Sequence, residues 1–221
     1  MKLRNQKEFV IICFCVVISL TLGIITHDMF IGFFTLLTGL LCGYYAAIGK
    51  RIHYFFGLVN YILLAIVASK NYLYGIFFFY LFIFAPLQIQ GFLAWGKNLD
   101  EQQNLAIRSF TFKNSWIVIG GCLVGSTLVG YLLNLLPGQQ LAFIDATSNC
   151  INLCGMILMM LRFKESWWIW FLNNILDLIL SIHCVIQNGE HSIMMLATAI
   201  AFLLINILGI IQWNQVENKN V

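Results

Sequence analysis

The sequence predicts an all-α integral membrane protein, and three observations lead to this fold class: its composition, its series of long apolar runs and the placement of its basic residues. Of the 221 residues, 61% are hydrophobic and only 10% are charged, and the mean hydropathy is +0.87. Soluble domains do not have this composition. The net charge of +3 is small, so no nucleic-acid partner is expected, and the lipid bilayer is the expected surrounding.

The apolar runs give the number of membrane spans. An α-helix rises about 1.5 Å per residue and needs about 20 apolar residues to cross a bilayer. The first run follows basic residues, as a signal peptide does, but no small-residue cleavage site follows it, so we interpret it as a helix. The eight predicted spans are 10–26, 30–48, 54–69, 73–95, 115–135, 140–161, 167–187 and 192–213.

The basic residues give the orientation of these spans. Cytoplasmic segments of membrane proteins carry an excess of Lys and Arg. With the amino terminus in the cytoplasm, eight spans leave only Lys70 outside. The other eleven basic residues are cytoplasmic: Lys2, Arg4, Lys7, Lys50, Arg51, Lys97, Arg108, Lys113, Arg162, Lys164 and Lys219. The sequence therefore predicts a multi-pass protein with both termini in the cytoplasm.

An internal repeat relates spans two to four to spans six to eight. Three groups of residues recur in the same order, at offsets of 113, 114 and 118 residues, measured from Phe30, Lys50 and Gln88. The first group is Phe30, Ile31, Leu41, Cys42 and Gly43, which recur as Phe143, Ile144, Leu153, Cys154 and Gly155. The others are Lys50 and Asn60, which recur as Lys164 and Asn174, and Gln88, Gly91 and Trp95, which recur as Asn206, Gly209 and Trp213.

This repeat predicts the domain organisation. Two three-helix units joined by a single linker helix have the same orientation in the membrane, as in one class of transporters. The expected parts are 1–29, an amino-terminal segment with an extra helix; 30–96, the first unit; 97–138, a cytoplasmic loop and the linker helix; 139–213, the second unit; and 214–221, a cytoplasmic tail. Parallel repeats of this kind enclose a pathway on their pseudo-symmetry axis, which favours transport.

Polar residues inside the spans indicate where that pathway lies, because such residues are costly in hydrocarbon. In the seventh span, Trp170, Asn174, Asp177 and Ser181 form one helical face, with Trp167 one turn earlier. Counting from the helix ends, amides of several other spans reach the same depth. The candidate substrate-binding residues are Gln88, Trp167, Trp170, Asn174, Asp177, Asn149, Asn152 and Asn60. The alternative is that the amides only bond helices to one another.

Other residues have more than one interpretation. Asp145, near the outer end of the sixth span, is expected to cap a helix or to be hydrated at the interface. His183 is interpreted as a packing residue, with a proton relay as the alternative. Trp95 and Trp213, at cytoplasmic helix ends, are expected to be interface anchors. Pro86 is expected to kink the fourth span.

The seven cysteines lie inside apolar runs and are expected to pack as small hydrophobic residues. Cys150 and Cys154 are one helical turn apart, so a pair of metal ligands is the open alternative. Neither a metal site nor a cofactor is predicted. An enzyme is not predicted either, because the sequence contains no HExxH or GxSxG motif.

The polar and aromatic residues predict the chemistry of the ligand. Trp167 and Trp170 offer flat faces to a planar ring and favour a positively charged one. Amides match the donors and acceptors of a carboxamide or of sugar hydroxyls. An anionic ligand is disfavoured, because no Lys or Arg enters the predicted membrane interior. A carrier of a vitamin or nucleoside therefore fits best, and a receptor or structural subunit is the alternative.

Two motifs resemble those of the PnuC-type nicotinamide riboside transporters. One is Trp167-x-x-Trp170-x-x-x-Asn174, and the other is Pro86-x-Gln88-x-x-Gly91-x-x-x-Trp95; the resemblance covers about 30–213. It implies a helix arrangement similar to the SWEET sugar transporters and facilitated diffusion of nicotinamide riboside through a bacterial plasma membrane. It also implies a homotrimer, and substrate binding by Trp167, Trp170, Asn174 and Gln88. Similar families carry thiamine, riboflavin or deoxynucleosides, which are alternative substrates.

Overall fold

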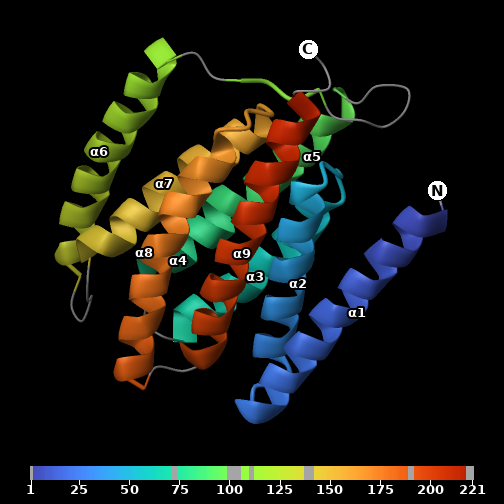
Figure 1. The fold of residues 1–221 in the computed structure, drawn as a ribbon. Helices are drawn as coiled ribbons and strands as arrows, with labels where there is room; N and C mark the ends of the chain where they lie inside the picture. The colour runs from blue at the N-terminus through green and yellow to red at the C-terminus, as the bar shows by residue number, and fades with distance from the viewer. Residues whose placement is uncertain are drawn as a thin grey trace.

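A computed structural model describes residues 2–70, 74–98, 106–109, 112–136, 142–188 and 192–217, and these form helices joined by short segments (Figure 1). The helices are α1 (Lys2–Ile25), α2 (Ile31–Ala47), α3 (His53–Lys70), α4 (Tyr74–Phe78), the π-helix η1 (Phe79–Phe84), α5 (Ala85–Gly96), α6 (Phe112–Asn134), α7 (Ala142–Met160), α8 (Ser166–Ile186) and α9 (Ser192–Glu217).

Each predicted span coincides with one helix, or with the continuous segment formed by α4, η1 and α5. Six of these helices are long and apolar enough to cross a membrane. Two shorter apolar helices, Ile31–Ala47 and Ile119–Asn134, occupy the remaining two positions. The prediction of an all-helical protein with several membrane-spanning helices is confirmed. The first turn of α1 and the last turn of α9 lie at the same end of the bundle (Figure 1).

Six helical segments form a closed ring in which each packs against the next. The order around the ring is α2, α3, α5, α7, α8 and α9, and α9 packs against α2 again. Helices α1 and α6 lie outside this ring, against α2 and α7 respectively. An ion pair between Lys50 Nζ and Glu8, 2.6 Å long, also ties α1 to the turn after α2. The ring therefore has an interior that α1 and α6 do not enter.

The distribution of polar side chains follows from the ring. The outward faces carry exposed apolar residues such as Phe14, Leu123 and Leu208, which suit contact with lipid. Polar residues face inward instead. Asn60, Gln88, Asn149, Asn173, Asn174 and Asn206 are all buried. Because an unsatisfied polar group in lipid is costly, this arrangement places the polar chemistry of the chain in the interior of the ring.

The fourth predicted span is irregular near Pro86. A π-helical segment, Phe79–Phe84, directly precedes α5, and Pro86 lies in the first turn of α5. Proline has no N–H for the carbonyl one turn earlier, so the hydrogen-bond ladder must change there. A π-helical segment therefore lies next to the residue at which a kink was predicted, and Gln88 lies just beyond it.

The prediction that Trp95 and Trp213 anchor the protein at the membrane interface is wrong. Their exposed fractions are 0% and 1%. Trp95 Nε1 donates to the carbonyl oxygen of Met159 at 3.0 Å, and Trp213 Nε1 donates to that of Ala46 at 3.3 Å. The two ring centroids lie 6.1 Å apart. Both tryptophans face the interior, because the helices approach one another closely at this end of the ring.

Some predicted features lie outside the described residues. They include the boundary between the linker helix and the second unit at 138–139, and residues 218–221 of the predicted tail. The side chains of Lys2, Arg4, Lys7, Lys113 and Lys219 also lie outside the described part of the chain.

Candidate functional site

The interior of the ring contains a cavity of about 360 Å³. Residues from α2, α3, α4, η1, α5, α7, α8 and α9 line it. All eight predicted site residues are among them: Asn60, Gln88, Asn149, Asn152, Trp167, Trp170, Asn174 and Asp177. Four sequentially distant spans therefore contribute these side chains to one space.

Trp167 and Trp170 form an aromatic corner in this cavity. Their ring centroids lie 5.5 Å apart and the ring planes are at 86°, an edge-to-face arrangement. Trp167 is buried and packs against Trp213, whereas Trp170 is half-buried. Among the described residues, neither indole Nε1 has a hydrogen-bond partner. The corner therefore offers apolar ring faces together with two free N–H donors.

Three buried amides also have unused hydrogen-bonding capacity. Asn174 Nδ2, Gln88 Oε1 and Asn206 Oδ1 have no partner within the described part of the chain. All three side chains line the cavity, and their exposed fractions are 7%, 5% and 2%. Buried polar atoms in proteins are almost always paired. A cluster of unpaired donors and acceptors around one cavity is therefore best explained by a polar ligand.

Two of the predicted amides already have partners. Asn60 Nδ2 donates to Thr35 O at 2.7 Å and to Thr38 Oγ1 at 3.1 Å, which joins α3 to α2. Asn149 Nδ2 donates to Asp145 Oδ1 at 2.7 Å within α7. The amide nitrogens of these two residues therefore bond to other groups of the helix bundle, which is the alternative to substrate binding that the sequence left open.

Asp145 was expected to cap a helix or to be hydrated at the interface, and the structure shows it buried. It lies in the first turn of α7, but its exposed fraction is only 2%. It lines the cavity and accepts a hydrogen bond from Asn149. Its position near the helix end suggested contact with water, whereas the neighbouring helices cover it.

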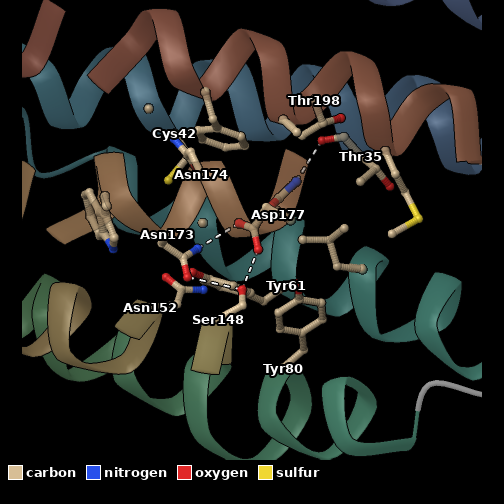
Figure 2. Close-up of a pocket in the computed structure, with 18 of the residues that line it drawn as sticks. Thr35, Cys42, Tyr61, Tyr80, Ser148, Asn152, Asn173, Asn174, Asp177 and Thr198 are labelled. Atoms are coloured by element: carbon tan, nitrogen blue, oxygen red, sulfur yellow. Dashed lines mark hydrogen bonds between the residues drawn. The ribbon is translucent and has the colours of Figure 1, made fainter. Parts of the chain in front are cut away.

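Asp177 is the centre of a hydrogen-bonded group that Figure 2 shows in close-up. Asn173 Nδ2 donates to Asp177 Oδ2 at 2.7 Å, and Ser148 Oγ donates to Asp177 Oδ1. Tyr61 and Tyr80 lie nearby and also line the cavity. The sequence analysis missed Ser148 and Asn173. A signal for Asn173 existed, because it precedes Asp177 by one helical turn, but the contact with Ser148 depends on how α7 packs against α8.

The charged residues of the cavity wall are acidic. Among the described residues that line it, Asp145 and Asp177 are the acids, and there is no Lys or Arg. His53 and His183 also line it, and the ring of His53 bonds the carbonyl oxygen of Lys50 at 2.9 Å. His183 thus faces the cavity and is not confined to packing between helices. Such walls suit a neutral or cationic ligand.

The cysteine pair considered as a metal site is not part of this cavity wall. Cys154 Sγ lies 3.0 Å from Cys122 Sγ, so it faces α6 on the outside of the ring. Among the described residues, no group of three or more His, Cys, Asp or Glu side chains is arranged to hold a metal ion.

Comparisons with known proteins relate this chain to a family of membrane transporters. Residues 29–215 match the family model described as nicotinamide mononucleotide transporter. The nicotinamide riboside transporter PnuC of Neisseria mucosa is 28% identical over 188 residues, which cover 83% of this chain and 71% of that protein. The PnuC protein of Haemophilus influenzae is 28% identical over 159 residues, which cover 70% of each chain.

A solved structure is also similar over nearly the whole length. It is described as the crystal structure of the vitamin B3 transporter PnuC, with a TM-score of 0.84 and 26% identity. The similarity covers 97% of this chain and 93% of that chain. The family match includes the residues of the cavity and the helices of the ring, apart from the last two residues of α9. The chain therefore belongs to the nicotinamide mononucleotide transporter family, and it is a multi-pass membrane transporter and not an enzyme.

Proposed function

We propose that this chain carries nicotinamide riboside across the membrane by facilitated diffusion, with the Trp and Asn/Gln side chains of the cavity as its binding site. One observation carries the proposal: the unpaired polar atoms of Trp167, Trp170, Asn174 and Gln88 surround a single cavity. Nicotinamide riboside joins a planar ring, a carboxamide and a sugar. The indole faces in the wall match the planar ring, and the amide groups match the carboxamide and the sugar hydroxyls.

The charge of the wall favours the riboside over the mononucleotide named in the family description. A mononucleotide carries a phosphate, which proteins bind with Arg, Lys or arrays of backbone N–H groups. The described cavity wall contains no Lys or Arg and includes the carboxylates Asp145 and Asp177. A phosphate would be desolvated there without a counter-charge. The similar proteins that are named for the riboside agree with this preference.

The fold of the proposed carrier is a pair of parallel three-helix units, one formed by α2 to α5 and the other by α7 to α9, with α6 as the linker. Support comes from the turns after α2 and α7. Gly49 and Arg162, which are 113 residues apart, both have positive φ, at 70° and 68°. The backbone bond from Lys50 N to Tyr45 O recurs as the bond from Phe163 N to Leu158 O at the same offset.

The offset between these two turns would shift the alignment of α3 with α8 by one residue. At an offset of 113, Asn60 corresponds to Asn173 and Tyr54 corresponds to Trp167. The sequence match had aligned Asn60 with Asn174, one residue further on. Asn173, which contacts Asp177, and Trp167 of the aromatic corner would therefore correspond to Asn60 and Tyr54 of α3.

The tryptophan contacts follow the same repeat and support alternating access. Trp95 on α5 bonds Met159 O on α7, and Trp213 on α9 bonds Ala46 O on α2. Met159 and Ala46 are also 113 residues apart. These two bonds join the units at the end of the ring that carries both termini. We infer that this Trp pair closes the cavity at that end and separates when the units rock apart.

The basic residues orient this carrier with both termini in the cytoplasm, so the Trp pair is the inner closure. The outer faces of the ring are free to contact other copies, and a homotrimer is the proposed assembly. A second substrate deserves testing: thiamine, which also joins a positively charged ring to further polar groups, suits the same acidic and aromatic wall.

Titration calorimetry of purified protein tests the binding site. We expect wild-type protein to bind nicotinamide riboside, and Trp170→Ala and Asn174→Ala each to weaken binding by about tenfold or more, because each removes a ring face or a buried donor. Trp168→Ala is the matched control. Trp168 lies next to this motif but is exposed on the outside of the ring, so its removal should leave the affinity unchanged.

Two results would contradict the proposal. Unchanged affinity in both Trp170→Ala and Asn174→Ala would show that the ligand does not lie in this cavity. Tight binding of thiamine with no binding of nicotinamide riboside would reassign the substrate while leaving the cavity as its site.

A further inference from the structure

The hydrogen-bond partners of Asp177 would not balance a negative charge on its carboxyl group. Its two carboxylate oxygens each accept one hydrogen bond, from Ser148 Oγ and from Asn173 Nδ2. Asn173 Nδ2 is a donor, and Ser148 Oγ lies within hydrogen-bond distance of both Asp177 Oδ1 and Asn173 Oδ1, so this arrangement accommodates an ionised carboxylate. Both partners are also neutral, so they satisfy hydrogen-bonding capacity without balancing the charge.

Among the described residues that line the cavity, none carries a fixed positive charge toward Asp177. Tyr61, Tyr80 and Asn152 approach from α3, η1 and α7, and they are neutral and polar. The described lining contains no Lys or Arg, and its other ionisable groups are Asp145, His53, His183, two cysteines and the tyrosines. An uncompensated carboxylate inside a membrane protein is costly. A cationic ligand in the cavity would remove that cost.

The rest of the wall indicates a ligand independently of this charge. The unpaired Trp167 Nε1 and Asn174 Nδ2 belong to side chains that are 1% and 7% exposed, and both lie on α8 with Asp177. Asn174 precedes Asp177 by three residues, so the two side chains lie on the same helical face. A ligand bonded to Asn174 is therefore within electrostatic range of the carboxylate.

We propose that Asp177, held by Ser148 and Asn173, is the counter-charge that makes this transporter select a positively charged ring over a neutral ring of the same shape. This inference rests on the proposed function and assigns a specificity role to one residue of that site. The ring nitrogen of nicotinamide riboside forms the glycosidic bond and so carries a fixed positive charge. The carboxylate and the indole faces both stabilise such a ring.

Benzamide riboside is the probe that isolates the charge. It has the carboxamide and the ribose of nicotinamide riboside, but its ring is joined through carbon and is neutral. Calorimetry of the wild-type protein should give an affinity for nicotinamide riboside about tenfold or more above that for benzamide riboside. In Asp177→Asn, the affinity for nicotinamide riboside should fall by about tenfold, whereas that for benzamide riboside should change by less than about twofold. Asp177→Glu, which keeps the charge, should retain most of the preference.

The results separate this inference from the proposed function. Equal affinities of the wild type for the two ribosides would overturn the counter-charge role while leaving the proposed substrate in place, and this measurement needs no variant. An unchanged ratio of the two affinities in Asp177→Asn would also overturn it. Loss of both affinities in equal proportion would show that Asp177 only supports the wall. Failure of the wild type to bind either riboside would overturn the proposed function and this inference with it.

Discussion

Two glycines determine how closely the aromatic side chains approach the helices of the ring. A Cβ added at Gly91 would overlap the Tyr54 ring, and a Cβ added at Gly209 would overlap the Trp167 ring. In both cases a helix backbone lies directly against a buried ring. This close approach fixes the position of Trp167 in the cavity, and it explains why Gly is present in the middle of α5 and α9 despite its low helix propensity.

Gly209→Ala tests this packing. We expect it to lower the free energy of unfolding by about 1–3 kcal/mol, because the added methyl group displaces a buried indole. It should also weaken riboside binding, since Trp167 lines the cavity. The thermal unfolding midpoint in detergent measures the first effect, and calorimetry measures the second.

Gly120→Ala is the matched control for that substitution. Gly120 lies in α6 with nothing within 4 Å of an added Cβ. Replacement should leave the midpoint unchanged or raise it slightly, because Ala is the better helix former. A midpoint that falls equally in both variants would contradict the packing argument.

The sequence predicted well where the secondary-structure elements lie and that they are helices. Long apolar runs have few alternatives in a bilayer, because the backbone polar groups must be paired within the span. The polar stripe of α8 was also predictable, since helical spacing alone puts Trp170, Asn174 and Asp177 on one face. Both the helices and the eight cavity residues were therefore accessible from periodicity and composition.

What the sequence did not predict depends on contacts between helices. Trp95 and Trp213 lie near helix ends, where a tryptophan can face either lipid or protein, and only the packing of α5 on α7 and of α9 on α2 decides between them. Ser148 was missed for the same reason. Its role follows from the rotation of α7 relative to α8, which no local pattern specifies.

The proposed inner closure by Trp95 and Trp213 can be tested by substitution. Trp95→Phe combined with Trp213→Phe removes both bonds between the units but keeps the aromatic bulk. Each bond contributes about 1 kcal/mol, so their loss should raise the population that is open at the terminal end by about tenfold or more.

Labelling of Cys42, a free cysteine of the cavity wall, measures this opening. In a variant that retains only this cysteine, a membrane-impermeant thiol reagent applied from the side of the termini should react severalfold faster after the double substitution. Trp168→Phe, on the outer surface, should have no effect. Equal labelling rates in all three proteins would contradict the proposed closure.

The whole molecule is a ring of helices with apolar outer faces and a polar, acidic and aromatic interior. These features depend on one another. The ring provides a space that lipid does not enter, and the unpaired amides make that space suitable for a ligand. The acidic wall disfavours a phosphate, and the proposed pair of parallel units would allow the space to open on either side. Transport follows from this combination, whereas binding alone would need only the cavity.

Countertransport in proteoliposomes tests this account most directly. Vesicles that contain the purified protein are loaded with unlabelled nicotinamide riboside and diluted into a trace of the labelled compound, with no ion gradient. The account predicts rapid transient accumulation of label inside, which Trp170→Ala should reduce strongly and Trp168→Ala should leave intact. Binding of the riboside by the protein without any exchange across the vesicle membrane would contradict it.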